Sequence, residues 1–131
     1  MRVKPGAEVC EAPDKDGKMR AVAENDRVLI IDRKLFKDDN LRIYIGTVES
    51  SDSNVVRIRG YLFHVSPYDV AGTERRGEER TRITSLASGD LIFILPAHIN
   101  PAEMVLKRSP KSMQLSDGVN NVDLTDFLSR A

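Results

Sequence analysis

The segment LRIYIGTVESSDSNVVRIRGYLFHV, residues 41–65, decides the fold that this sequence predicts. Its first part alternates apolar residues with Arg42 and Tyr44, which is the period of two shown by a strand with one buried face. Those apolar residues are Leu41, Ile43 and Ile45. Ser, Asp and Asn then fill residues 50–54, where their short side chains bond the local backbone and favour a turn. The segment therefore predicts a long β-hairpin.

Two glycines interrupt the alternation of this hairpin. Gly60 separates two sets of apolar residues that have opposite parity, Val56 and Ile58 before it and Tyr61, Phe63 and Val65 after it. Gly46 has a similar place in the first strand, because Val48 follows Ile45 by an odd number of residues. A glycine at a change of parity predicts a β-bulge that bends the strand. We expect a mainly β fold, a small strongly bent sheet or barrel of about five strands, with short helices at the C-terminal end.

The same segment resembles the Sm and Sm-like family of small RNA-associated barrels. Gly46-Thr47-Val48 followed by Asp52 and by Asn54-Val55-Val56 is similar to the first signature of that family, and Ile58-Arg59-Gly60 is similar to the second. The two signatures lie closer together here than in the family, with no strand between them. The resemblance implies single-stranded RNA as the first ligand to test, with its pocket at Asp52, Asn54, Arg57 and Arg59.

Composition narrows the class of protein. The 131 residues carry 20 Lys+Arg and 20 Asp+Glu, so the formal net charge is zero, which argues against duplex DNA as the main partner. The single cysteine, Cys10, permits no intramolecular disulfide and no multi-cysteine metal site. No apolar run has the length of a signal peptide or a membrane span, so we expect a soluble, cytoplasmic protein with no membrane partner.

We expect three parts along the chain. Residues 1–26 are polar and rich in turn signals, and they form either an arm or a loose hairpin. Residues 27–99 form the β-barrel core, and residues 100–131 form a helix and hairpin extension. The core ends with Leu91–Leu95, five consecutive apolar residues that predict a strand covered on both faces.

The C-terminal extension leaves one alternative open. Asn100, Pro101 and Glu103 have the pattern of a helix start, yet residues 101–108 also read as a strand. Asp117-Gly118 predicts a hairpin, and Leu124 to Leu128 predict a short closing helix.

One polar group of residues suggests binding. If Gly60 is a bulge, then Arg57, Arg59 and His64 share the outer face of the curled strand beside Asp52 and Asn54, where they could hold a phosphate and a base edge. The alternative is a solvated strand face whose arginines discourage aggregation. We find no pattern of catalytic residues, no metal site and no cofactor motif.

The sequence therefore predicts a non-catalytic binding module. It is expected to form homo-oligomers through its strand edges, with single-stranded RNA as the first ligand to test. The alternative is a structural or assembly subunit that acts only through protein–protein contacts. The few aromatic residues, 5% of the chain, favour that alternative because they offer little surface for base stacking.

Overall fold

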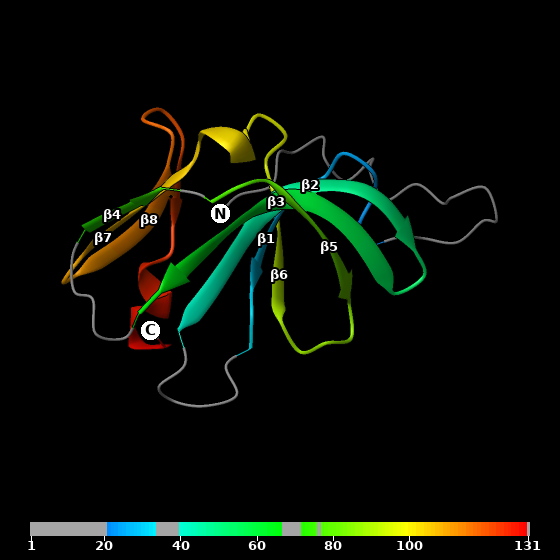
Figure 1. Cartoon of the computed structure of the whole chain (residues 1–131), viewed down its shortest axis with the longest axis horizontal. Coiled ribbons are helices and arrows are strands. Elements are labelled where there is room, and N and C mark those ends of the chain that lie inside the picture. The colour runs from blue at the N-terminus through cyan, green and yellow to red at the C-terminus, as the bar shows by residue number, and fades with distance from the viewer. Residues whose placement is uncertain (1–20, 34–39, 67–71, 76, 131) are drawn as a thin grey trace.

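The computed structural model describes residues 21–33, 40–66, 72–75 and 77–130, which form two antiparallel β-sheets (Figure 1). The first sheet has five strands in the order β5-β3-β2-β1-β6. They are β1 (Arg27–Ile31), β2 (Leu41–Asp52), β3 (Val55–Val65), β5 (Arg80–Ser85) and β6 (Leu91–Leu95). The second sheet has the order β4-β7-β8-β9. Its strands are β4 (Gly72–Arg75), β7 (Val105–Ser109), β8 (Ser112–Ser116) and β9 (Asn121–Asp123). The prediction of a mainly β fold is confirmed.

The predicted hairpin forms the centre of the first sheet. Strands β2 and β3 pair from Leu41–Val65 to Asp52–Val55, and both ribbons curve strongly (Figure 1). The turn passes through Ser53, whose φ of 52° lies in the left-handed region that short polar residues tolerate. The hairpin is thus the longest ladder of the molecule's described part, and the other strands of this sheet add to its two sides.

The predicted bulges at Gly46 and Gly60 are wrong. These two glycines pair directly with each other in an unbroken register, and the one shift in the ladder lies between Val48 and Ser50, which makes Glu49 the extra residue. A Cβ on Gly46 would lie 2.5 Å from the Arg59 carbonyl oxygen. A Cβ on Gly60 would lie 2.6 Å from the Gly46 Cα and closer still to the Ile45 carbonyl oxygen. The glycines are therefore needed for the close approach of two bent backbones.

The change of parity reflects two cores on opposite faces of the first sheet. Tyr61 and Phe63 belong to a larger core that joins both sheets, whereas Val56 and Ile58 belong to a smaller core on the other face. Strand β3 therefore buries one face near its start and the other near its end. Each fully buried aliphatic or aromatic side chain stabilises the fold by about 1.5–3 kcal/mol.

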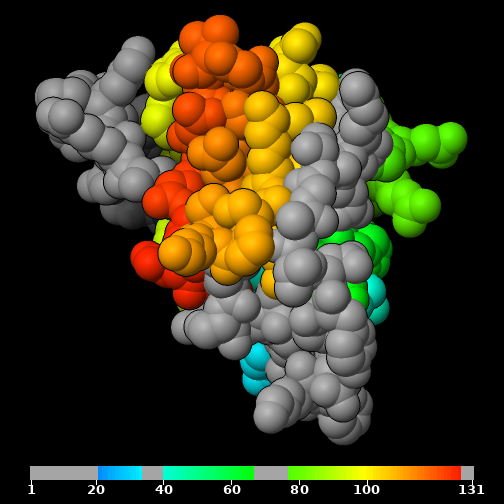
Figure 2. Space-filling view, turned by 90° about the vertical axis from the view of Figure 1, so that its left-hand side faces the viewer, coloured from blue at the N-terminus to red at the C-terminus, as the bar shows by residue number. Residues whose placement is uncertain are grey.

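The second sheet covers the larger core. Met104, Leu106, Met113 and Leu115 are fully buried there against side chains of β1, β2 and β3. Figure 2 looks onto the outer side of this sheet, where the orange and red residues form one surface.

The first sheet is bent but does not close into a barrel, because β5 and β6 are its two outer strands and share no ladder. Side chains connect its two ends instead. The Arg82 guanidinium, on β5, lies 2.7 Å from the Asp32 carboxylate and 3.6 Å from that of Asp90. Arg82 also stands 5.4 Å from the centre of the Tyr44 ring, which is a favourable cation–π distance. Asp32 follows β1 and Asp90 precedes β6, so one arginine joins the opposite ends of the sheet.

The predicted C-terminal α-helices are absent from the described residues. Residues 101–108 contain one short 3-10 turn, η2 (Pro101–Glu103), and most of strand β7, and the closing segment is a second 3-10 turn, η3 (Thr125–Arg130). Asn100 caps η2 as predicted, since its Oδ1 accepts a hydrogen bond from the Ala102 N–H at 3.1 Å. The helix does not continue because β7 pairs with β4 and β8, whose ladder and burial outweigh local helix preference.

Other predictions are confirmed or lie outside the described chain. The Asp117-Gly118 hairpin forms between β8 and β9, with Gly118 at a φ of 95°. The predicted N-terminal arm falls almost wholly on residues 1–20, outside the described residues. In the described part of the chain, no helix has the length and apolar character needed to cross a membrane.

The space at Gly60 leads to a stability prediction. Gly60→Ala is expected to lower the free energy of unfolding by at least about 2 kcal/mol, because the new Cβ would overlap backbone atoms of Ile45 and Gly46 on the paired strand, which cannot move aside. Urea denaturation measures this change. Gly77→Ala is the matched control, since nothing lies within 4 Å of its Cβ, and it should change stability by no more than about 0.5 kcal/mol. Equal denaturation midpoints for the two variants would contradict the close approach.

Tyr44 leads to a pH prediction. Its hydroxyl lies 2.6 Å from the Arg80 carbonyl oxygen and 3.1 Å from that of Ile58, and burial raises the pKa of Tyr44 to about 12 although Arg82 opposes the shift. In the unfolded chain the pKa is the ordinary 10.0, so this contribution to stability is complete below pH 10 and is lost as the pH rises towards 12. Between pH 10 and 12, the melting temperature of the wild type should fall more steeply with rising pH than that of Tyr44→Phe. Parallel curves would show that the hydroxyl does not titrate in this way.

Candidate functional site

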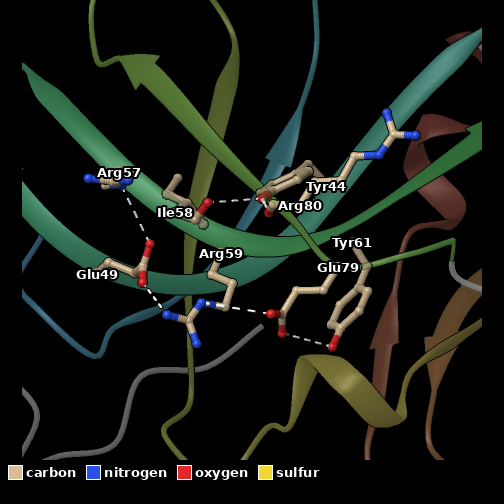
Figure 3. Close-up of polar contacts among 8 residues, drawn as sticks. All are labelled: Tyr44, Glu49, Arg57, Ile58, Arg59, Tyr61, Glu79 and Arg80. Carbon is tan, nitrogen blue, oxygen red and sulfur yellow. Dashed lines mark hydrogen bonds and ion pairs between the residues drawn. The ribbon is translucent and has the colours of Figure 1, made fainter.

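Two exposed arginines define the candidate site on the first sheet. Arg57 and Arg59 lie two residues apart on β3, so their side chains project from the same face of the strand. Their side chains are 60% and 54% exposed. Figure 3 shows them beside Glu49, Glu79 and Tyr61.

The β-bulge places an acidic residue beside both arginines. Glu49 is the extra residue of β2, and a bulge of this kind re-aims the side chain that it carries. Its Oε1 lies 3.7 Å from the Nε of Arg57, and its Oε2 accepts a short hydrogen bond from the Nη2 of Arg59. This hydrogen bond to Glu49 raises the pKa of Arg59 above the ordinary value. The bulge therefore gives both guanidinium groups a carboxylate partner.

A second carboxylate meets Arg59 from the segment that precedes β5. The Glu79 Oε1 lies 3.8 Å from the Arg59 Nε, and the Tyr61 hydroxyl donates a hydrogen bond of 3.1 Å to the other oxygen of Glu79 (Figure 3). Arg59 thus stands between two carboxylates. Since all these charged groups are partly exposed, each pair contributes only about 0–1 kcal/mol to stability.

Four of these residues, Glu49, Arg59, Tyr61 and Glu79, line a cleft of about 430 Å³ between the hairpin and η2. Strands β2 and β3 supply Glu49, Arg59 and the hydroxyl groups, the segment before β5 supplies Glu79, and the segment at η2 supplies an amide and an apolar wall. The lining residues are Asn25, Thr47, Val48, Glu49, Arg59, Tyr61, Glu79, Asn100, Pro101 and Ala102. Two carboxylates and one guanidinium face this space, so the cleft is not a ready anion site: a phosphate there would have to displace Glu49 or Glu79 from Arg59.

The structure brings only part of the predicted site together. Arg57 and Arg59 meet at Glu49, whereas Asp52 ends β2 opposite Val55 and Asn54 lies in the turn, both exposed. His64 is exposed on the face opposite to the arginines, because the ladder is regular at Gly60 and an odd number of residues separates His64 from Arg59. The predicted common face for the arginines and His64 is therefore wrong.

Sequence reasoning missed Glu49, Tyr61 and Glu79. Glu49 reaches the arginines only because the bulge falls on it, and no glycine or change of residue type marks that position. Tyr61 could have been placed beside Arg59, since residues two apart on a strand share a face. Glu79 comes from a separate segment, and its contact depends on how β5 pairs with β3.

The outer strands of the first sheet form a second candidate surface. Among the described residues, β5 pairs only with β3 and β6 pairs only with β1, so each presents a row of unpaired backbone groups. Large apolar side chains are exposed along these edges: Ile83 on β5 is 70% exposed, and Leu91 and Ile94 on β6 are 38% and 36% exposed. These edges can bind another strand.

No group of three or more metal-ligating side chains comes together in the described parts of the chain. A comparison with protein-family models found no match to this chain. Comparisons with curated proteins and with solved structures also found no match.

Proposed function

We propose that this protein is a non-catalytic assembly module that binds copies of itself through the outer strands of its five-stranded sheet. The observation that supports this most directly is the pair of outer strands, which lack a second strand partner in the described chain and carry exposed apolar side chains. Soluble proteins normally protect such edges with charge, proline or a bulge, and β6, which contains no charged residue, lacks the first of these protections. The proposal includes a cytoplasmic location.

The charge of the protein supports protein partners. The net charge of the full sequence is zero, and the exposed Arg57 and Arg59 are each beside a carboxylate. Association through strands adds backbone hydrogen bonds and apolar contact without requiring a charged surface.

Single-stranded RNA is the second candidate partner. Arg57 and Arg59 are more than half exposed and belong to the segment that resembles the Sm-like family, and Arg59 lines the cleft. Against this candidate stand Glu49 and Glu79, whose charges offset those of the arginines.

Assembly is tested by the mass of the purified full chain in solution. Multi-angle light scattering over a concentration series should give a mass above that of one chain, and the mass should fall on dilution because the interface is small. A mass of one chain at every concentration would overturn the proposed assembly.

The RNA candidate is tested by filter binding of an oligouridylate at two salt concentrations. If RNA binds at the arginines, Glu49→Gln should tighten binding severalfold by freeing both guanidinium groups. Changing Arg57 and Arg59 to alanine should reduce the salt dependence by a slope of roughly 0.7 for each phosphate that the protein no longer neutralises. Asp126→Asn removes one negative charge outside the cleft and is the matched control. Retention that does not depend on salt, or equal effects of the two acidic substitutions, would remove this candidate.

A further inference from the structure

Strand β6 has a sequence that reads the same in both directions, Leu91-Ile92-Phe93-Ile94-Leu95. One side of this strand pairs with β1 over its whole length, from Leu91–Ile31 to Leu95–Arg27. The other side has no strand partner in the described chain. An antiparallel pair of two identical strands is related by a two-fold axis whatever their sequence, and the palindrome of β6 lets each residue of such a pair meet a residue of its own type.

Pairing centred on Phe93 joins like residues throughout. Leu91 lies opposite Leu95 of the second copy, Ile92 lies opposite its Ile94, and the two Phe93 residues meet at the axis. Cross-strand pairs of this kind stand about 4.5–5.5 Å apart, close enough for the side chains to pack. The partly exposed Leu91 and Ile94 would then each be covered by an apolar side chain.

The axis also places the corresponding faces of the two sheets on the same side of the joined sheet. Leu91, Phe93 and Leu95 project to the face of the larger core, and Ile92 and Ile94 project to the face of the smaller core. A two-fold axis perpendicular to the sheet leaves each face on its own side. Two five-stranded sheets would therefore continue as one sheet, with no polar residue brought opposite an apolar one.

The charges at the two outer strands favour β6 over β5. No charged residue lies within β6. Asp90, just before it, is held by its own chain, because its Oδ1 accepts from the Arg33 N–H at 2.7 Å and its Oδ2 from the Ser88 hydroxyl at 3.0 Å. Pro96, just after it, has no N–H and ends the ladder. Strand β5 in contrast carries two arginines, and although Arg82 is paired with Asp32 and Asp90 of its own chain, the exposed Arg80 makes this edge a charged one.

We infer that β6 pairs with β6 of a second copy and that the assembled protein is a two-fold symmetric dimer. This inference rests on the proposed assembly and names its partner strand, its register and its symmetry. A pairing of β5 with β6 would instead relate the copies head to tail and would produce a closed ring or an open filament.

The test compares lysine substitutions on the two outer strands. Ile94→Lys places a charge opposite Ile92 of the second copy and should raise the dimer dissociation constant at least tenfold. Leu91→Lys should act in the same direction through Leu95 of the second copy. Ile83→Lys, on β5, is the matched control: its side chain is the more exposed, and the dimer should persist. Light scattering gives the masses, and thermal unfolding by circular dichroism checks that the variants fold.

The outcomes separate this inference from the proposed assembly. A wild-type dimer that Ile94→Lys dissociates and Ile83→Lys leaves intact supports both. The β6 pairing is overturned if both β6 variants still assemble. It is also overturned if the wild type is larger than a dimer and the β5 variant disrupts it. Either result still supports the proposed assembly. A wild-type monomer overturns both. If Ile94→Lys fails to fold, Leu91→Lys decides between these results.

Discussion

Gly46 and Gly60 face each other across the β2–β3 ladder, and the rest of the first sheet depends on the space that their missing side chains leave. With that space the two longest strands bend together without breaking their register. The bend lets one sheet bury its two faces at different places: near the turn it covers the smaller core, and at the far end it packs on the second sheet. A flat pair of strands would present the same face along its whole length, and the two sets of apolar residues could not both be buried.

The bend also fixes the surroundings of the arginines. Beyond the glycine pair, the extra residue at Glu49 takes up the mismatch between the two strands and carries its carboxylate to Arg57 and Arg59. A surface that reads as cationic in the strand sequence is therefore close to neutral in the folded protein. Large apolar side chains are exposed on the outer strands, at Ile83, Leu91 and Ile94, and also at Val55 and Val119.

The hairpin, the mainly β class and the turn at Asp117-Gly118 could be predicted from the sequence. Strand alternation and turn preferences depend on only a few neighbouring residues, so local patterns are enough to indicate them. The change of parity at Gly60 is also present in the sequence, but its interpretation as a bulge is wrong. A strand that changes its buried face and a strand with an extra residue both shift the alternation of apolar residues by one position, so the sequence does not distinguish them. The prediction of helices after Asn100 is wrong because β4, which lies far upstream in the sequence, pairs with this segment and makes it strand β7. For the candidate site, the exposure of Arg57 and Arg59 could be anticipated. Their carboxylate partners could not, since one depends on the position of the bulge and the other on a non-local strand pairing.

Arg82 gives the sheet a junction of a different kind from all its others. Neighbouring strands are joined by backbone hydrogen bonds, whereas the β5 end is tied to Asp32 and Asp90 through a guanidinium group. The three side chains are each less than a third exposed, so dissolved ions screen this junction less than they screen an ion pair at the surface. The distance between the two ends of the sheet therefore depends on a single side chain, and a substitution of Arg82 would release these ends while every strand pair stays in place.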